Sequence, residues 1–197
     1  MNLALFDFDG TITTREMFRP FIEFAVSPRR RMFGGALLAP MVAGYKLGWV
    51  SPNIMRRSAV QLGFRGVAQA HAFARGEQFA RDVLPGVLRP EALERIRWHK
   101  EQGDRVVVVS GALDVYMSPW CRTHGLELLC SQLESHDGRL TGRYRGEQCV
   151  NAEKSRRVRA AYDLFAYPVV YAYGDTPEDR HLLAMAHRRY FQWQEVS

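Results

Sequence analysis

Two aspartates stand two residues apart at the end of the first apolar segment of the chain. The segment LALFDFDGT, residues 3–11, has the composition of a buried β-strand as far as Phe6 and then carries Asp7 and Asp9. Two carboxylates this close cannot both remain ionised without a counter-charge. One of them could attack an electrophile while the other transfers a proton, so the pair suits nucleophilic and acid–base chemistry.

Two later apolar segments, DRVVVVSG and YPVVYAYGD, also end in polar residues. In an open parallel sheet, ligands bind beyond the carboxyl ends of the strands. We therefore expect one crevice to collect the residues at the three strand ends, together with a lysine from a predicted helix: Asp7, Asp9, Ser110, Gly111, Asp175, Asp179 and Lys154.

Such a crevice would crowd several carboxylates together. A hard divalent cation relieves their repulsion, and oxygen ligands with room for water favour Mg²⁺. A phosphate between the metal, Lys154, the Ser110 hydroxyl and backbone N–H groups would be held by electrostatics. The residue types therefore predict metal-assisted transfer of a phosphoryl group.

The segments after residue 84 predict the elements that position these residues. From Pro90 the apolar residues follow a helical period that ends at Gly103, and residues 113–124, 152–165 and the stretch EDRHLLAMAHRR are further predicted helices. Short β-branched segments between them are typical of strands buried on both faces. The stretch LELLCSQLESHDGRLTGRYRG predicts a hairpin with HDG at its turn, and YFQW predicts a last strand.

The region between residues 14 and 84 follows a different pattern. In MFRPFIEFAV the apolar residues recur at helical spacing, residues 52–83 predict further helices, and no stretch looks like a strand. Alternating helices and strands favour a mostly parallel sheet covered on both faces. We therefore predict an α/β fold, a Rossmann-like three-layer core of residues 1–14 plus 84–197, with a helical cap, residues 15–83, inserted after the first strand.

Composition restricts the class of protein only loosely. The chain of 197 residues carries a net charge of +6, which suits phosphorylated substrates, anionic lipid or nucleic acid, and also an ordinary solvated surface. The three cysteines are odd in number and form no CxxC pair, which argues for a reducing compartment and against a disulfide scaffold. Because Met1 leads straight into the first predicted strand, we expect a cytoplasmic protein.

One apolar stretch complicates that expectation. Arg29–Arg31 precede MFGGALLAPMVAGY, a run of 14 residues without a charge. A membrane span needs about 20 residues, so we expect no stable insertion into a membrane. We favour a helix buried in the cap; peripheral contact with a membrane surface through residues 29–45 is the alternative.

The four motifs DFDGT, VVVVSG, the lone Lys154 and GDTPED resemble, in this order, those of the haloacid dehalogenase-like (HAD) hydrolase superfamily. The helical block after the first motif looks like the type 1 cap of subfamily IB. That subfamily includes phosphoserine phosphatases, histidinol-phosphate phosphatases and a branch of phosphatidylglycerophosphatases. The stretches IRWHKEQGDRVVVVSGALD and YAYGDTPED look like its group of hypothetical phosphatases.

The resemblance implies roles for the core residues. Asp7 would be the nucleophile that forms an aspartyl-phosphate. Asp9 would be the general acid and then base, and its backbone carbonyl would ligate Mg²⁺. Ser110 and the N–H of Gly111 would bind the phosphoryl oxygens, and Lys154 would neutralise charge on the nucleophile and the phosphoryl group.

The resemblance also implies the rest of the metal site and, less firmly, the specificity residues. Asp175 would ligate Mg²⁺ and Asp179 would support its water shell. Where phosphoserine phosphatases carry GDGAND, this chain has Glu178 in place of the asparagine, which weakens phosphoserine as the substrate. Glu16 would hold a substrate amine or would be an exposed cap residue. Two cap arginines would contact a second anionic group or would lie in solvent: Arg19 and Arg56.

The leading hypothesis is therefore a Mg²⁺-dependent phosphatase of a small phosphomonoester, with no nucleic-acid partner. Transfer to an acceptor alcohol in place of water would need the same residues. A phosphoryl-receiver or binding module without turnover is a second class, which the acid/base beside Asp7 argues against. A lipid-phosphate phosphatase acting at the membrane surface is a third. The sequence predicts neither the physiological substrate nor the oligomeric state.

Overall fold

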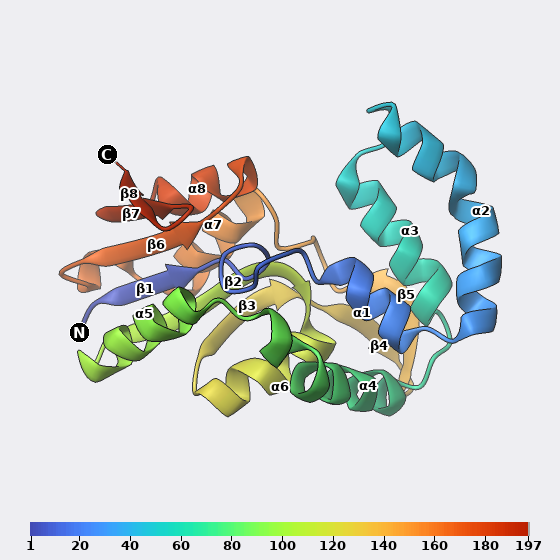
Figure 1. The fold of residues 1–197 in the computed structure, drawn as a ribbon, viewed down its shortest axis with the longest axis horizontal. Coiled ribbons are helices and arrows are strands. Elements are labelled where there is room, and N and C mark those ends of the chain that lie inside the picture. The colour runs from blue at the N-terminus through green and yellow to red at the C-terminus, as the bar shows by residue number, and fades with distance from the viewer. Residues whose placement is uncertain (197) are drawn as a thin grey trace.

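A six-stranded sheet forms the centre of the computed structural model, which describes residues 1–196 (Figure 1). The strands lie in the order β3-β2-β1-β6-β7-β8. Neighbouring strands are parallel except β7 and β8. Their bounds are β1 Leu3–Phe6, β2 Arg105–Leu113, β3 Glu127–Ser131, β6 Val170–Gly174, β7 Arg188–Phe191 and β8 Gln194–Val196. The predicted α/β fold with a mostly parallel sheet is confirmed.

Helices cover both faces of this sheet, and the central strands are apolar throughout for that reason. Alternate residues of β1 enter two different cores: Leu3 and Leu5 lie with Val158 on one side, and Ala4 and Phe6 lie on the other. The first side is covered by α7 Ala152–Ala161 and α8 Arg180–Leu183, the second by α5 Pro90–Glu101 and α6 Asp114–His124. The predicted helix from Pro90 is confirmed, with Gly103 at positive φ just after its end.

Four helices follow β1: α1 Phe18–Ala25, α2 Pro28–Lys46, α3 Pro52–Phe64 and α4 Gln69–Asp82. The expected absence of strands is confirmed over residues 14–83, all of which the structure describes. Helix α4 packs against α6, and the hairpin of β4 Leu133–His136 and β5 Arg139–Tyr144 packs against α3. The division into a core and a cap over 15–83 stays a prediction; Ser197, the end of that predicted core, lies outside the described residues.

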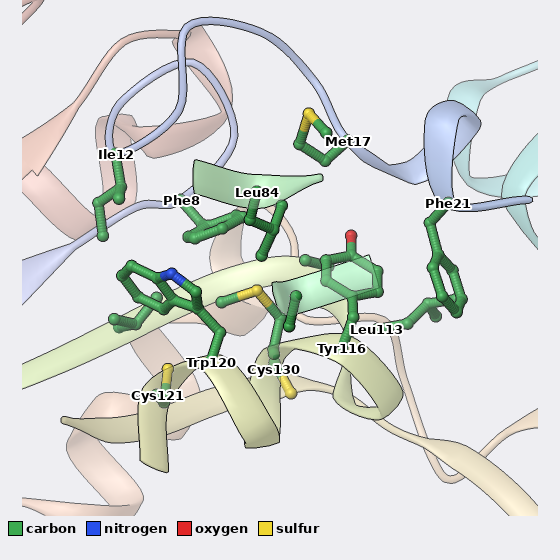
Figure 2. Close-up of a cluster of buried hydrophobic side chains, with 14 of the residues drawn as sticks. Phe8, Ile12, Met17, Phe21, Leu84, Leu113, Tyr116, Trp120, Cys121 and Cys130 are labelled. Atoms are coloured by element: carbon green, nitrogen blue, oxygen red, sulfur yellow. The ribbon is translucent and has the colours of Figure 1, made fainter. Parts of the chain in front are cut away.

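Phe8 anchors the stretch that carries the two aspartates. Its side chain is fully buried, and its ring meets that of Trp120 edge-on with the centroids 5.1 Å apart. Figure 2 shows Phe8 within a cluster that also holds Leu84, Leu113 and Trp120. The residue between Asp7 and Asp9 therefore faces the core, which leaves the two carboxylates for the opposite side.

Two predicted elements near the middle and the end of the chain differ from the structure. LELLCS forms β3 of the main sheet, parallel to β2, so the predicted hairpin begins only at Leu133. It begins there because Leu128 and Leu129 pack into the two opposite cores, which places this segment in the sheet. The stretch EDRHLLAMAHRR is helical only over Arg180–Leu183, because Arg188–Phe191 pairs with β6 as β7. YFQW holds the end of β7 and the turn into β8.

The expectation that residues 32–45 are buried in the cap is wrong. They form most of α2, but Met32, Phe33 and Leu37 are each about two-thirds exposed. Helix α2 packs mainly against α3, and its buried residues are Gly34 and Gly44. No helix among residues 1–196 combines the length and apolar character needed to cross a bilayer.

Gly76 fixes how closely α4 approaches α6. A Cβ atom added at Gly76 would lie 1.9 Å from the carbonyl oxygen of Val115. We expect Gly76→Ala to lower the free energy of unfolding by roughly 3 kcal/mol, because the packed helices must separate to admit the methyl group. Urea denaturation measures the change.

Gly35→Ala is the matched control, since nothing lies within 4 Å of the methyl group that it adds. It should leave stability unchanged or raise it by up to about 1 kcal/mol through helix propensity. Equal stability of the two variants would contradict the close approach of α4 and α6.

Candidate active site

The loop after β1 is built around a close approach to Asp175. The backbone N–H of Asp7 donates to the carbonyl of Tyr173 at 2.9 Å and so extends the pairing of β1 with β6. Gly10 then takes a φ of +82°, and a Cβ there would lie 2.0 Å from Oδ2 of Asp175. Only glycine satisfies both the left-handed backbone and the contact, so the DFDGT loop and the end of β6 fit together at this residue.

Lys154 lies between two buried carboxylates. It stands in the first turn of α7, and only 3% of it is exposed. Its Nζ donates to Oδ1 of Asp179 at 2.6 Å and also to Oδ1 of Asp7. Asn151, which precedes α7, has a φ of +50°, a conformation that asparagine adopts more readily than most residues. The helix therefore starts where its lysine can reach both aspartates.

Asp179 holds the loop that carries Asp175. It is fully buried, and its Oδ2 accepts the N–H groups of Asp175 and Thr176, both at 3.2 Å, and the Thr176 hydroxyl at 3.3 Å. Its other oxygen accepts from Lys154. Asp179 thus has four polar partners and orients both the lysine and the Asp175 loop.

Sequence reasoning placed Thr11 at the end of the first strand without giving it a role, and it missed Arg89. The hydroxyl of Thr11 donates to Oδ1 of Asp175 at 3.2 Å and lies 3.5 Å from Oδ2 of Asp7. Arg89 donates from Nε to the carbonyl of Gly10 at 3.1 Å and lines a pocket that Asp7 and Asp175 also line. The place of Thr11 in the sequence, two residues after Asp9, could have indicated that its hydroxyl lies near the aspartates. Nothing local marks Arg89, because only the fold brings it to this loop.

The electrostatics of the site are those of several carboxylates around the buried Lys154, with arginines farther out in the same pocket. Burial raises the pKa of Asp7 while the ammonium of Lys154 opposes that rise, and burial with the nearby Asp179 raises the pKa of Asp175. Burial raises the pKa of Asp9 to about 7, and Glu16 adds to the effect. Asp7 and Asp179 raise the pKa of Lys154 although burial alone would lower it, so the lysine stays charged. The cluster retains an excess of negative charge.

Three of the carboxylates are close enough to share a cation. Oxygens of Asp7, Asp175 and Asp179 all lie within 4.8 Å of one another. Carboxylate oxygens are the donors that hard divalent cations prefer, and a divalent charge would offset the excess that Lys154 leaves. The residues present therefore fit Mg²⁺. The Asp9 carboxylate is not part of this group of three; its Oδ1 accepts the N–H of Met17 at 2.9 Å.

The predicted core residues meet in one pocket of about 540 Å³. Its lining includes Asp7, Asp9, Ser110, Gly111, Lys154 and Asp175, while the buried Asp179 supports it from behind. Ser110 is fully buried within β2, at the shift in its register with β3 that precedes the end of the strand, and its Oγ accepts the N–H of Ala112 at 3.1 Å. The three strand ends thus converge as the rule for parallel sheets requires.

The four predicted specificity residues divide between two places. Glu16, Arg56 and Glu178 line the pocket that holds Asp7. Arg56 lies with Nη2 3.7 Å from Oε1 of Glu16, and its buried Nη1 has no hydrogen-bond partner among the described residues. The side chain of Arg19 is 83% exposed and pairs with Glu23, and Arg19 does not line this pocket.

Comparison with known proteins decides the family, since residues 4–184 match the haloacid dehalogenase-like hydrolases. The chain belongs to that family. Protein CicA of Caulobacter vibrioides is 32% identical over 188 residues, which cover 93% of this chain and 82% of CicA.

Solved structures share the fold of this HAD family member. A protein of unknown function from Bordetella pertussis Tohama I has a TM-score of 0.79 at 23% identity, covering 96% of this chain and 89% of that one. A probable phosphoserine phosphatase from Vibrio cholerae has a TM-score of 0.70 at 17% identity, covering 96% and 56%. A phosphoserine phosphatase solved as an analogue of its phospho-aspartyl intermediate has a TM-score of 0.65 at 22% identity, covering 96% and 85%.

Removal of the Lys154 charge tests how the cluster is held. We expect Lys154→Met to lower the free energy of unfolding by about 3–5 kcal/mol, because Asp7 and Asp179 would remain buried without their cation. Chemical denaturation in EDTA measures the loss. Adding Asp7→Asn to Lys154→Met should recover part of it, since one of the two orphaned charges is then gone. A variant as stable as the wild type would show that the contacts among these three residues are not formed.

Proposed function

We propose that this HAD hydrolase is a Mg²⁺-dependent phosphatase that acts on phosphomonoesters through an aspartyl-phosphate at Asp7. The observation that carries the proposal is the convergence of Asp7, Lys154 and Asp179 in a pocket that also presents Asp9 and Ser110. A nucleophile, an acid/base and phosphate-binding groups are then within one cavity. The intermediate analogue solved for a phosphoserine phosphatase of the same fold is consistent with this route.

In the first step, an oxygen of Asp7 attacks phosphorus and the bond from phosphorus to the ester oxygen breaks. Asp9 donates its proton to that oxygen, which leaves as an alcohol. A pKa of about 7 suits this task, because Asp9 is then protonated in part of the molecules near neutral pH. Lys154, Ser110 and the N–H of Gly111 bind the phosphoryl oxygens as charge develops on them.

In the second step, Asp9 takes a proton from water, the water oxygen attacks phosphorus, and the acyl phosphate bond breaks. Inorganic phosphate leaves and the Asp7 carboxylate is restored. Mg²⁺ held by Asp7, Asp175 and the carbonyl of Asp9 would supply charge neutralisation for both steps, with Asp179 supporting its water shell. An acceptor alcohol in place of water would turn the same chemistry into phosphotransfer. Asp9 beside the nucleophile favours turnover over a stable phosphoryl receiver.

The mouth of the pocket would select the substrate. Arg56 offers a guanidinium nitrogen that is buried without a partner, and such a donor favours an anionic group on the substrate. Glu16 and Glu178 flank it in the pocket lining. We propose that these three cap and loop residues contact the leaving group and that Arg19 does not.

Asp7→Asn should lower kcat on p-nitrophenyl phosphate by about 10³-fold or more, because the amide cannot act as the nucleophile. Acid quenching with a ³²P-labelled substrate should trap labelled wild-type protein and no labelled variant. Asp137→Asn is the matched control: its side chain is 88% exposed in a hairpin turn with positive φ, where asparagine is equally suited. Wild-type activity in Asp7→Asn would refute the assignment.

Metal removal tests the cofactor. EDTA should abolish phosphatase activity, and Mg²⁺ in excess of the chelator should restore it. Independently of activity, Mg²⁺ should raise the Tm of the wild type and of Asp137→Asn, and should leave the Tm of Asp175→Asn nearly unchanged because a ligand charge is lost. Activity that is indifferent to chelation, with no Tm shift, would overturn the metal assignment.

A further inference from the structure

Exposed apolar side chains gather on α2 and the turn after it. Seven of the twelve large hydrophobic side chains that are exposed among the described residues lie here: Met32, Phe33, Leu37, Val42, Tyr45, Leu47 and Trp49. Trp49 is the most exposed of them, at 82%. Figure 1 shows α2 at the edge of the molecule, away from the main sheet. These seven residues are called the α2 surface below.

The fold leaves these side chains uncovered because α2 meets its neighbour through glycines. A Cβ at Gly34 would lie 3.5 Å from Leu62 of α3, and a Cβ at Gly44 would lie 3.0 Å from Val50. The close contact uses the positions without side chains, so the large residues face outward. A helix that is apolar on nearly all sides is normally buried, in protein or in lipid. An exposed patch of this kind therefore indicates an external binding partner.

The charge around the α2 surface indicates what kind of partner. Between Glu23 and Glu77 the chain has no acidic residue and eight lysines and arginines. Arg29, Arg30 and Arg31 lie at the start of α2 and Lys46 at its end, and none of them has a carboxylate partner among the described ion pairs. Arg30 and Arg31 donate to backbone carbonyls, which leaves their charge unneutralised. The partner should thus be both apolar and anionic.

We propose that the α2 surface binds an anionic lipid bilayer. The apolar side chains would enter the boundary between headgroups and acyl chains, and the flanking arginines and Lys46 would contact lipid phosphates. The helix would lie in this interface, since no described helix can cross a membrane. A bilayer satisfies both requirements at once, whereas a second copy of this chain would bring two basic segments together.

The α2 surface also adjoins the active site. A pocket of about 520 Å³ is lined by Phe18, Ile22, Tyr45 and Met55, and by three residues that it shares with the catalytic pocket: Glu16, Arg56 and Glu178. The two pockets thus adjoin at these three residues, and the second, which Arg19 also lines, reaches Tyr45 near the end of α2. A phosphomonoester with an apolar group anchored in the bilayer could reach Asp7 by this route; this step rests on the proposed function, and membrane binding does not.

Co-sedimentation with vesicles tests the proposal. The full chain should pellet with vesicles of phosphatidylcholine and phosphatidylglycerol, should pellet much less with phosphatidylcholine alone, and should be released as salt is raised. The affinity of the triple variant Phe33→Ser/Leu37→Ser/Trp49→Ser for anionic vesicles should be at least about tenfold lower than that of the wild type. Phe165→Ser is its control, since Phe165 is fully exposed on the predicted core, outside the α2 surface.

Charge is tested with a second matched pair. Arg29→Gln/Lys46→Gln should lower binding to anionic vesicles several-fold, whereas Arg122→Gln/Arg159→Gln, which removes two exposed charges from α6 and α7, should leave it unchanged. Trp49 fluorescence should shift to the blue on binding and be quenched by brominated lipid, and the quenching should be largely lost in Trp49→Phe. Unchanged Tm and hydrolysis of p-nitrophenyl phosphate would show that each variant is folded.

Several results would overturn the proposal. Absence of binding to anionic vesicles would do so, as would equal binding by the triple variant and Phe165→Ser. A dimer that dissociates in the triple variant, with no binding to vesicles, would instead assign the α2 surface to a second copy. Asp7→Asn should bind vesicles as well as the wild type, so loss of phosphatase function and loss of membrane binding are separable outcomes.

Discussion

The placement of the Lys154 ammonium between Asp7 and Asp179 is the constraint on which the rest of the site depends. The three residues come from the end of β1, the first turn of α7 and the segment after β6. Removing three charged groups from water costs several kcal/mol each, and only close pairing offsets that cost. The contact therefore fixes α7 and the segment after β6 relative to β1. It also leaves carboxylate oxygens that could bind a cation.

Much of this arrangement could be predicted from local patterns. Apolar strands that end in Asp7, Ser110 and Asp175 predict the site, because parallel strands present their carboxyl ends at one edge. The same reasoning misplaced the bounds of β7 and did not predict the position of α2. Residues 188–191 become a strand only because β6 offers them a partner. Helix α2 is exposed because Gly34 and Gly44 make its close contacts, with Leu62 of α3 and with Val50 before α3. Such outcomes depend on tertiary neighbours, which a single sequence does not display.

The pocket that holds Asp7 and the exposed surface of residues 24–76 differ in their charged residues. In the pocket, buried carboxylates surround Lys154, and arginines also line it: Arg15, Arg56 and Arg89. Over residues 24–76 the chain is basic and apolar without any acid, and its arginines remain near the surface. The acidic cluster and the exposed basic, apolar surface thus lie in different segments, and Arg56 lines both the pocket that holds Asp7 and the adjoining pocket beside Tyr45.

The strand order has a consequence for how the protein is made. Within this sheet β1 is synthesised before the other strands, yet its residue Leu3 pairs with Arg105 on one side and Val170 on the other. The residues of β1 therefore remain without both partner strands until β6 has been synthesised. Contacts between segments so far apart in the sequence also form slowly. The acidic pocket is complete only once Asp179 has emerged. A nascent chain thus holds Asp7 without its contacts to Lys154 and Asp179 until synthesis is nearly finished.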